Sequence, residues 1–529
     1  MHGVDSENRD YIIGIDIGSS NVVMSFGVRN DEGVVSVLGV EVQSIEDCVK
    51  DGDITNYVGL GNAIAKAKAA LEAEVNRKIN SAYVGVSGRS VYCVRYEDYV
   101  TISDRVGYVT ENELRELNAR IEMVVPGGGD EIVERIPLRY IIDDRQEVKN
   151  PIGAFGSKLS ATYLFVMVGK HQIDRVNRAM HRAEIAVSGL CVNPTILPQA
   201  ILREDESEEG VVVVDIGGDL TDISIVKEGK LWYFSSLPIG ASAITNDLYD
   251  FLRIPKRDIE TVKRKYGSAI ADGIEADATV SVKTPTKANK QILQRNIAEI
   301  AEERLKDIAR FVARELRAAK YSTKLPCGVV LTGGSAYLSN IDKLFARELN
   351  MEVRFATLFN GIDEESQSKV LVNAHSVAMG LLVYGAKHNA CSTTIPLTLP
   401  TPPTQPTQPT QPTQPTPPAE GVKSEETIGL GEKDSKEKDS KEKDSKEKDT
   451  PTPPIHEPEN TKPTNPEKLN PNNEAKPKEE TTNGGNGTTP TGKGGNEQGE
   501  NGGRGNKKPG FFARVRNWVE ENVFNDDYI

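Results

Sequence analysis

Cysteine is scarce in this sequence of 529 residues, and long apolar runs are missing. The five cysteines form no CxxC pair and have no even spacing, which excludes a disulfide framework and the common zinc sites. We therefore expect free thiols in a reducing cytoplasm. The cysteines are Cys48, Cys93, Cys191, Cys327 and Cys391.

Membrane-spanning and export segments are not apparent either. No window reaches the run of about eighteen apolar residues that a transmembrane helix needs. The first ten residues, MHGVDSENRD, are polar and lack the apolar segment of a signal peptide. We expect a chain that is neither secreted nor membrane-spanning.

Positive charge is in deficit, with 64 Lys and Arg against 78 Asp and Glu, a formal net charge of −14 and a pI of about 5.2. A nucleic-acid-binding protein needs a basic face to displace counterions. Nucleic acid is therefore excluded as a partner, and a protein or nucleotide partner is expected.

Composition divides the chain near residue 390. Up to that point the apolar content suffices for a core of two or more domains, and beyond it the sequence is of low complexity. PTQ repeats begin at Pro403 and KEKDS repeats at Lys433, and an Asn/Gly-rich stretch follows. Such a segment is expected to be a disordered linker with a span of about 60 Å as a flexible chain.

Strand–turn–strand patterns are the main feature of the folded part. A strand over 11–17 leads through Gly18-Ser19-Ser20-Asn21 into a strand over 22–28. About 200 residues later, a strand over 211–214 leads through the acidic, glycine-containing stretch 215–222 into a strand over 223–226. A third buried strand, 329–332, precedes Gly333-Gly334-Ser335.

The remaining segments are predicted from periodicity. Apolar spacing predicts a helix over 61–79 and a strand over 82–94, and residues 95–164 are expected to form an inserted subdomain. A long helix is predicted over 291–320, with Ile297, Ile300, Leu305, Ile308, Phe311 and Leu316 on its apolar face.

The three turns are suited to holding a nucleotide. Glycines let backbone N–H groups approach phosphate oxygens, and the serines add donors. The carboxylates of Asp16 and Asp215 would hold Mg²⁺ beside the phosphates through water. Any one turn could be a simple strand connection, but their repetition favours a nucleotide site between two related domains. The candidate ligand-binding residues are Asp16, Gly18, Ser19, Ser20, Asn21, Asp215, Gly217, Gly218, Gly333, Gly334 and Ser335.

The stretches YIIGIDIGSSNVVMSFG, VVVVDIGGDLTDISIV and VVLTGGSAYLSNI resemble the phosphate-1, phosphate-2 and adenosine motifs of the actin and heat-shock-chaperone ATPase superfamily. The resemblance implies a two-lobed α/β fold that binds ATP and Mg²⁺. It also implies that adenine lies beside Gly333 and Gly334 and against the helix that contains Arg304 and Asp307, with Arg304 either stacked on the base or simply solvated.

Four further stretches resemble the FtsA family of bacterial cell division proteins: SAYVGVSGRS, IPLRYIIDDRQEVKNPIGAFGSKL, LPIGASAITNDLYDFL and KRKYGSA. This resemblance implies subdomain IA over 1–86 and 165–203, IC over 87–164, IIA over 204–240 and 325–388, and IIB over 241–324, then a linker over 389–506 and an amphipathic helix over 507–529.

Membership of the FtsA family would imply a set of partners. The chain would form actin-like filaments with the help of subdomain IC and recruit other division proteins. It would also bind the C-terminal peptide of the tubulin-like protein FtsZ on subdomain IIB, at residues that the sequence does not identify.

Two departures from the superfamily pattern concern nucleotide handling. Asp219 and Leu220 stand where phosphate-2 motifs usually carry glycine and threonine, and an extra carboxylate near phosphate would weaken binding. Asn193 stands near the position where many members place Glu or Gln to orient the attacking water, and Asn cannot act as a base. We therefore predict very slow or absent ATP hydrolysis.

The last segment regains apolar and aromatic residues. On a helical wheel, one face carries an apolar set and the opposite face carries Arg514, Asn517 and Glu521. Basic residues, among them Arg514 and Arg516, would meet anionic headgroups at about 1 kcal/mol each. We predict a membrane-binding helix, although docking onto the folded part or a partner is the alternative. The apolar set is Phe511, Phe512, Val515, Trp518, Val519 and Val523.

Three other functions remain open at this point: a PilM-like pilus-assembly adaptor, a small-molecule kinase of the same superfamily and an MreB-like shape filament. The helix on its long linker favours an FtsA-like role over the first, and no sugar-binding or acid-binding aspartate stands out for the second. The MreB family lacks the IC signature and usually lacks such a tail.

Overall fold

The computed structural model describes residues 10–394 except 104–106, 284–288, 322–324, 359, 369 and 392. The chain divides into two units, residues 1–409 and 410–529, and the described residues all belong to the first. Most of the predicted linker and the whole predicted membrane-binding helix therefore lie outside the described residues. Within the described part, no helix is long and apolar enough to cross a membrane.

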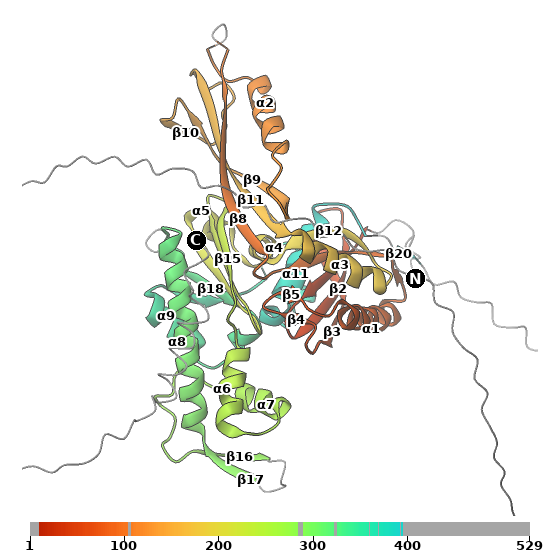
Figure 1. Ribbon diagram of the computed structural model, residues 1–529, viewed down its shortest axis with the longest axis vertical. Helices are drawn as coiled ribbons and strands as arrows, with labels where there is room; N and C mark the ends of the chain where they lie inside the picture. The colour runs from red at the N-terminus through yellow and green to blue at the C-terminus, as the bar shows by residue number, and fades with distance from the viewer. Residues whose placement is uncertain are drawn as a thin grey trace, which may run out of the picture. The chain divides into compact units, whose positions relative to one another are not determined.

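The first five-stranded sheet lies near the N-terminus and has the order β12-β7-β1-β2-β3 (Figure 1). β1, β2 and β3 form an antiparallel meander, and β7 and β12 continue the sheet in parallel with β1. Helices α1 and α3 pack on each other, and α4 and α11 do likewise. We call this part lobe I. It comprises β1 Asp10–Ile17, β2 Asn21–Arg29, β3 Val35–Ser44, α1 Tyr57–Val75, β7 Ser81–Val86, α3 Lys170–Arg182, β12 Ala186–Val192, α4 Asn193–Ile201 and α11 Val372–Ala386.

A second five-stranded sheet repeats this topology in the order β15-β14-β13-β18-β19. Again an antiparallel meander is followed by two parallel strands. The predicted repetition of the opening hairpin is confirmed, because β13–β14 occupies the place in its sheet that β1–β2 occupies in the first. These strands are β13 Val211–Ile216, β14 Thr221–Lys227, β15 Lys230–Leu237, β18 Val329–Thr332 and β19 Val353–Phe355.

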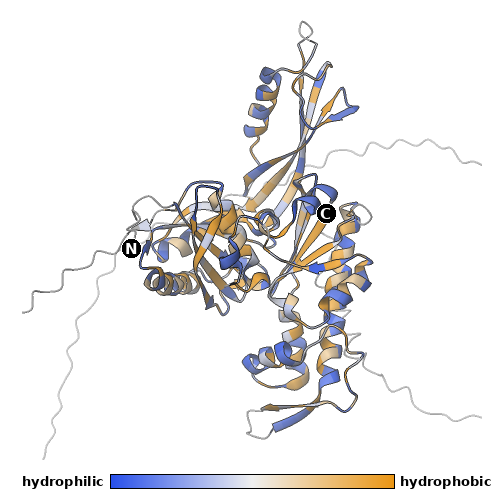
Figure 2. Ribbon diagram, turned by 180° about the vertical axis from the view of Figure 1, so that it is seen from behind, coloured by the Kyte–Doolittle hydropathy of each residue, from blue (hydrophilic) through white to orange (hydrophobic). Residues whose placement is uncertain are grey.

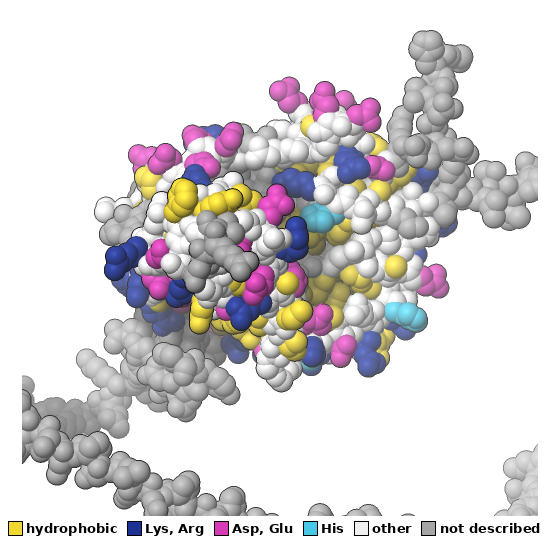
Figure 3. All heavy atoms as spheres, turned by 90° about the horizontal axis from the view of Figure 1, so that it is seen from above, with side chains coloured by type: hydrophobic (Ala, Val, Ile, Leu, Met, Phe, Trp, Pro, Cys, Tyr) yellow, Lys and Arg dark blue, Asp and Glu magenta, His cyan; other side chains and the backbone are white. Residues whose placement is uncertain are grey.

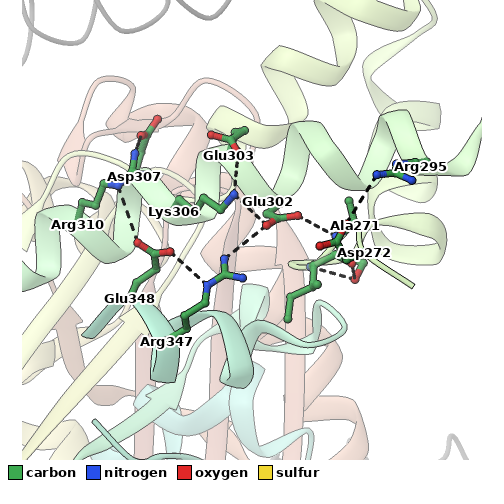
Figure 4. Close-up of polar contacts among 12 residues, drawn as sticks. Ala271, Asp272, Arg295, Glu302, Glu303, Lys306, Asp307, Arg310, Arg347 and Glu348 are labelled. Atoms are coloured by element: carbon green, nitrogen blue, oxygen red, sulfur yellow. Dashed lines mark hydrogen bonds and ion pairs between the residues drawn. The ribbon is translucent and has the colours of Figure 1, made fainter. Parts of the chain in front are cut away.

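Helices and a β-hairpin complete this second part, which we call lobe II. The long helix α8 buries the predicted apolar residues Ile297, Ile300, Leu305, Ile308 and Leu316, with Phe311 partly buried. Its polar face carries an ion-pair network with α9 and the 271–272 segment (Figure 4). The elements are α5 Glu204–Glu209, α6 Ser242–Leu252, α7 Lys256–Tyr266, β16 Thr279–Lys283, β17 Asn289–Leu293, α8 Gln294–Ala318, η1 Gly334–Tyr337 and α9 Ile341–Leu349. The short helix α10 Glu364–Gln367 packs instead against β3 of lobe I.

Between β7 and α3 the chain forms an antiparallel four-stranded sheet, β10-β9-β11-β8, with α2 packed against β8. We call residues 91–169 the insert. Thr110 begins α2 with a capping box that includes Glu113. The insert has its own apolar core, which includes Leu117, Leu159 and Phe165. Its elements are β8 Val91–Thr101, α2 Glu111–Glu122, β9 Asp130–Ile142, β10 Gln146–Val148 and β11 Lys158–Gly169.

Hydrophobic residues concentrate in the strands of both large sheets, whereas the helices alternate apolar and polar residues (Figure 2). Seen from above, hydrophobic side chains also reach the surface among acidic and basic ones (Figure 3). On the insert, the side chains of Val125 and Phe155 are 84% and 79% exposed. The short strands are β4 Val49–Lys50, β5 Asp53–Ile54, β6 Lys78–Ile79 and β20 Thr393–Thr394.

One sequence prediction of the fold is wrong. The strand expected over 82–94 is two strands, β7 and β8, which are separated by the turn 87–90. Gly88 in this turn has φ of +129°, and a Cβ there would lie 2.7 Å from the Cα of Gly52. Only glycine fits such a close backbone approach in that conformation. The chain therefore leaves lobe I at this point and enters the insert.

Candidate nucleotide site

The tips of the two equivalent hairpins are closed by equivalent backbone hydrogen bonds. In lobe I the N–H of Gly18 donates to the carbonyl of Asn21 at 3.0 Å, and in lobe II the N–H of Gly217 donates to the carbonyl of Leu220 at 2.9 Å. The repeated small residues therefore encode a repeated tight turn, placed at the same end of two equivalent sheets.

The two tips face each other across the lobes. A Cβ on Gly218 would lie 2.8 Å from Ser20 Oγ and 3.7 Å from Ser19 Cβ. The other hairpin therefore leaves little room for a side chain at position 218, where any Cβ would displace the Ser20 hydroxyl. The structure thus brings the two sets of candidate phosphate-binding residues together.

The third turn packs against the second hairpin. Gly333 has φ of +92°, and a Cβ there would lie 2.4 Å from Asp215 Oδ1. Ser335 Oγ donates to the carbonyl of Gly217 at 3.2 Å. Around Gly334 the space is open. The third predicted turn therefore lies beside the second, as a site for one ligand requires.

Three carboxyl groups lie in this region: Asp16 at the end of β1, Asp215 near the end of β13, and Asp222, which pairs with Asp215 across the β13–β14 ladder. Burial raises the pKa of Asp16 to about 7, and the charge of Asp222 adds to this rise. Burial raises the pKa of Asp222 to about 6. The pKa of Asp215 is also raised, first by burial and then by Asp222 and Asp16. The charge of Asp222 thus disfavours ionisation of Asp16 and Asp215, and the charge of Asp16 disfavours ionisation of Asp215.

Asn193, the first residue of α4, reaches Asp16. Its Nδ2 donates to Asp16 Oδ1 at 3.1 Å, which opposes the rise in the pKa of Asp16. The side-chain Oδ1 of Asn193 is buried without a hydrogen-bond partner among the described residues. The sequence prediction that Asn193 lies near the hydrolysis position is consistent with this location, but ATP turnover stays a prediction.

These oxygen donors fit a hard divalent cation. Carboxylates whose pKa values are raised mainly by burial are stabilised in the ionised form by a cation, and Mg²⁺ prefers oxygen ligands and retains water. Among the described residues, however, no group of three or more His, Cys, Asp or Glu side chains is arranged as a direct metal-binding cluster. Coordination through water, as expected for Asp16 and Asp215, is compatible with both observations.

Two predicted residues have other surroundings. Arg304 is buried in α8, and its Nε and Nη2 donate to Asp247 Oδ2 at 2.9 and 2.8 Å, which ties α8 to α6. Stacking of this guanidinium on adenine stays a prediction. Asp219 lies at the tip of the second hairpin and is partly exposed, so its effect on phosphate also stays a prediction.

Sequence reasoning missed two polar groups. Asp222 was read only as part of the hairpin, yet its carboxylate accepts hydrogen bonds from Ser87 of lobe I and Ser236 of β15. Lys263 of α7 is buried with Glu260 at 2.7 Å, and its Nζ donates to the carbonyl of Ala241 at 3.3 Å. Lys263 is one of several charged residues on α7, and nothing in the sequence distinguishes it from its more exposed neighbours.

Lys263 lies close to the second hairpin through the backbone. The N–H of Ala241 donates to the carbonyl of Gly217, and the N–H of Ser242 donates to the carbonyl of Gly218, at 3.1 and 2.8 Å. The start of α6 is therefore hydrogen-bonded to the second hairpin, and Lys263 is hydrogen-bonded to the start of α6.

Family models match both the insert and lobe II. The model described as "Cell division protein FtsA" matches residues 212–379, and the model described as "SHS2 domain inserted in FTSA" matches residues 88–167. The second range agrees closely with the insert, whose first and last strands span 91–169.

Curated relatives cover most of the described part. The cell division protein FtsA of Pseudomonas aeruginosa is 28% identical over 377 residues, which are 71% of this chain and 89% of that protein. FtsA of Bacillus subtilis is 29% identical over 351 residues, which are 66% of this chain and 79% of that protein. Among solved structures, a chain of the PilM-PilN type IV pilus biogenesis complex aligns with a TM-score of 0.50 at 15% identity and covers 71% of this chain and 98% of that one. This last likeness supports the fold alone.

Proposed function

We propose, from the premise that this chain belongs to the family of the cell division protein FtsA, that it is an ATP-binding, polymerising adaptor. It tethers FtsZ to the inner face of the cell membrane at the division septum and helps to recruit the other division proteins. A role in cell division follows from the family, and the finer activities are our proposal.

The nucleotide part of the proposal rests on one observation: the turns of the two equivalent hairpins approach so closely that a Cβ on Gly218 would lie 2.8 Å from Ser20 Oγ. Backbone N–H groups on opposing tips suit phosphates held from two sides. Asp16 and Asp215 would hold Mg²⁺ there, and the cation would supply positive charge beside the phosphates. Gly333, Gly334 and Ser335 would lie beside the adenosine.

Hydrolysis is proposed to be very slow or absent. The amide of Asn193 donates to Asp16 and cannot accept a proton from water as a carboxylate does. Bound ATP would therefore act mainly by fixing the orientation of the lobes and, through it, the contacts between subunits.

The adaptor part rests on the sequence beyond the described residues. The amphipathic segment 507–529 would lie in the membrane interface, and the linker would let the folded part stand away from the bilayer. Self-association would use the insert, which presents exposed apolar side chains such as Val125 and Phe155.

Cosedimentation with anionic liposomes tests this proposal. The full chain and a chain that ends at Asn506 are compared, each with and without FtsZ. We expect only the full chain to pellet with the liposomes and to carry FtsZ with it. If both chains stay in solution, the membrane role is wrong, and a PilM-like adaptor or a soluble kinase of the same superfamily becomes the better account. Phosphorylation of a panel of small molecules would favour the kinase.

A further inference from the structure

The turn 87–90, through which the chain enters the insert, is held by lobe II. Ser87 Oγ donates to Asp222 Oδ2 at 2.6 Å, and Ser236 Oγ donates to Asp222 Oδ1. The two hydroxyls are 2.9 Å apart. Ser87 and Asp222 are only 6% and 7% exposed. One buried carboxylate therefore joins the root of the insert to two strands of lobe II.

Asp222 is rigidly coupled to the candidate phosphate-binding hairpin. It lies directly opposite Asp215 in the β13–β14 ladder, and the tip that approaches Ser20 is formed by the residues between them. Because an antiparallel ladder moves as one body, a ligand that shifts this tip also shifts the Asp222 carboxylate.

The contact continues for a short distance beyond the turn. The N–H of Phe234 on β15 donates to Cys93 Sγ at 3.5 Å, and this thiol donates to the carbonyl of Phe234 at 3.4 Å. Arg95 Nη2 donates to the carbonyl of Trp232 at 3.5 Å. β8 and β15 belong to different sheets, so side chains rather than a backbone ladder join these two edges.

Further out, the insert and lobe II stay in contact, because Lys230 Nζ of β15 donates to the carbonyl of Leu138 on β9 at 2.9 Å. A cavity of about 420 Å³ opens between them, lined by residues that include Arg95, Arg139, Lys227, Trp232 and Lys320. The contacts between the insert and lobe II thus extend beyond its root, and the buried hydrogen bond from Ser87 to Asp222 is the one that the 215–222 hairpin itself makes.

We propose that Asp222 is a positioning residue that, through Ser87 and Ser236, couples the nucleotide state of the 215–222 hairpin to the position of the insert. Nucleotide binding would then reorient the surface of the insert that carries the exposed apolar side chains. The inference rests on the proposed nucleotide site and adds the route by which that site regulates self-association. Such coupling requires a contact with two alternative arrangements whose populations both the nucleotide site and the insert can change. We assign this contact to Ser87, Ser236 and Asp222.

Hydrogen–deuterium exchange of the full chain tests this coupling, measured without nucleotide and at saturating ATP with Mg²⁺. Three segments are compared: the 211–222 hairpin, β15 and β8. Ser87→Ala removes the hydroxyl that crosses between the lobes, and Ser87→Thr restores it. Ser90→Ala is the matched control, because Ser90 Oγ lies in the same turn but donates to Asp53 of lobe I at 3.1 Å.

In the wild type we expect ATP to change the exchange rate by about threefold or more in all three segments. In Ser87→Ala the change should persist in the hairpin and become clearly smaller in β8, and Ser87→Thr should restore it. Ser90→Ala should behave as the wild type does. A merely structural role of Ser87 would alter exchange equally with and without nucleotide.

Two results would overturn the inference, and they can be told apart. If Ser87→Ala retains the wild-type response of β8, the coupling does not pass through Ser87, and the inference is wrong. The proposed nucleotide site is not affected by that result. If ATP changes exchange in none of the three segments of the wild type, the proposed nucleotide site fails, and the inference fails with it. If Ser87→Ala does not fold, Ser87→Cys provides the same comparison, because a thiol is a much weaker hydrogen-bond donor than a hydroxyl and fills the space of the side chain.

Discussion

Asn193 Nδ2 lies 3.1 Å from Asp16 Oδ1 and donates a hydrogen bond to it. The two residues are 177 apart in sequence, one at the start of α4 and the other near the end of β1. The amide is thus a donor to a carboxyl group whose pKa burial raises to about 7. The strength of this hydrogen bond depends on whether Asp16 is protonated, so a variant of Asn193 should have a pH-dependent stability.

Replacing Asn193 with Asp should destabilise the ligand-free protein in a pH-dependent way. At pH 8 both carboxyl groups are ionised, so a hydrogen bond is lost and a repulsion is added, at a cost of about 1–3 kcal/mol in the free energy of unfolding. A carboxyl with a raised pKa holds its proton in the folded state up to about pH 7. Below that pH, protonated Asp16 can donate to the new carboxylate, and the loss should shrink.

The measurement is urea unfolding of the wild type and the variant at pH 5.5 and pH 8. Asn62→Asp is a matched control, because Asn62 Oδ1 accepts from Arg182 Nε at 2.8 Å and a carboxylate preserves this contact. Equal destabilisation by Asn193→Asp at both pH values would contradict the pairing with Asp16.

Gly240→Ala should weaken ATP binding while the fold persists. A Cβ at position 240 would lie 2.3 Å from the carbonyl oxygen of Gly218, so the second hairpin has to move away from the start of α6. Because the shift occurs in backbone that faces the proposed phosphates, we expect affinity for ATP with Mg²⁺ to fall by about tenfold or more.

Titration with a fluorescent ATP analogue measures this loss, and circular dichroism checks the fold. Gly127→Ala is the control, because a Cβ there meets nothing within 4 Å. Unchanged affinity in Gly240→Ala would mean that the hairpin 217–220 does not contact the nucleotide.

The sequence predicted the elements that carry the site. β1, β2, β13, β14 and β18 each begin and end within two residues of the prediction, because each is an apolar run bounded by a small-residue turn. The helix predicted over 61–79 begins instead at Tyr57, where Asn56 Oδ1 caps it through the N–H of Gly59. A local side-chain contact decided that boundary, and apolar spacing does not report it.

Long-range contacts could not be predicted from local patterns. Gly88 is needed because Gly52 packs against it, and Ser87 and Asp222 are 135 residues apart in sequence. The ion pair of Arg304 with Asp247 likewise joins two helices whose relative position is set by the tertiary fold. Residues that are distant in sequence and meet only in the tertiary fold make the polar contacts of the site. Local patterns therefore identified the turns but not the side chains that contact them.

Glu302 should be the main stabilising residue of the network between α8 and α9. Its carboxylate accepts from the N–H of Ala271 at 2.8 Å and pairs with Lys306 and Arg347 at 2.9 and 3.5 Å (Figure 4). Its side chain is 13% exposed. Glu302→Ala leaves this buried N–H without its acceptor, and we expect a loss of about 1–3 kcal/mol.

Glu303→Ala is the natural control, because Glu303 is 48% exposed and pairs only with Lys306 among the contacts in Figure 4. We expect a loss of about 0–0.5 kcal/mol. The pKa of Glu302 is lowered; burial opposes this, and the bonds from Lys306 and Ala271 outweigh it. Its stabilisation is therefore present above the unfolded pKa and lost as pH falls through the lower folded value. Thermal unfolding at pH 7 and pH 3.5 should show a smaller difference between the two variants at pH 3.5 than at pH 7.

Trp518→Glu tests the predicted membrane-binding helix without removing it. On the helical wheel Trp518 lies on the apolar face, and Asn517 lies on the opposite face. A carboxylate in the membrane interface is unfavourable and is also repelled by anionic lipid, so the fraction of protein bound to anionic vesicles should fall by about tenfold. Asn517→Glu adds the same charge on the face that remains in water and should reduce binding only through the weaker general repulsion. Flotation of the two variants with vesicles of phosphatidylglycerol measures the difference. Equal loss in both variants would mean that charge alone attracts the segment to the membrane and that it does not bind as an amphipathic helix.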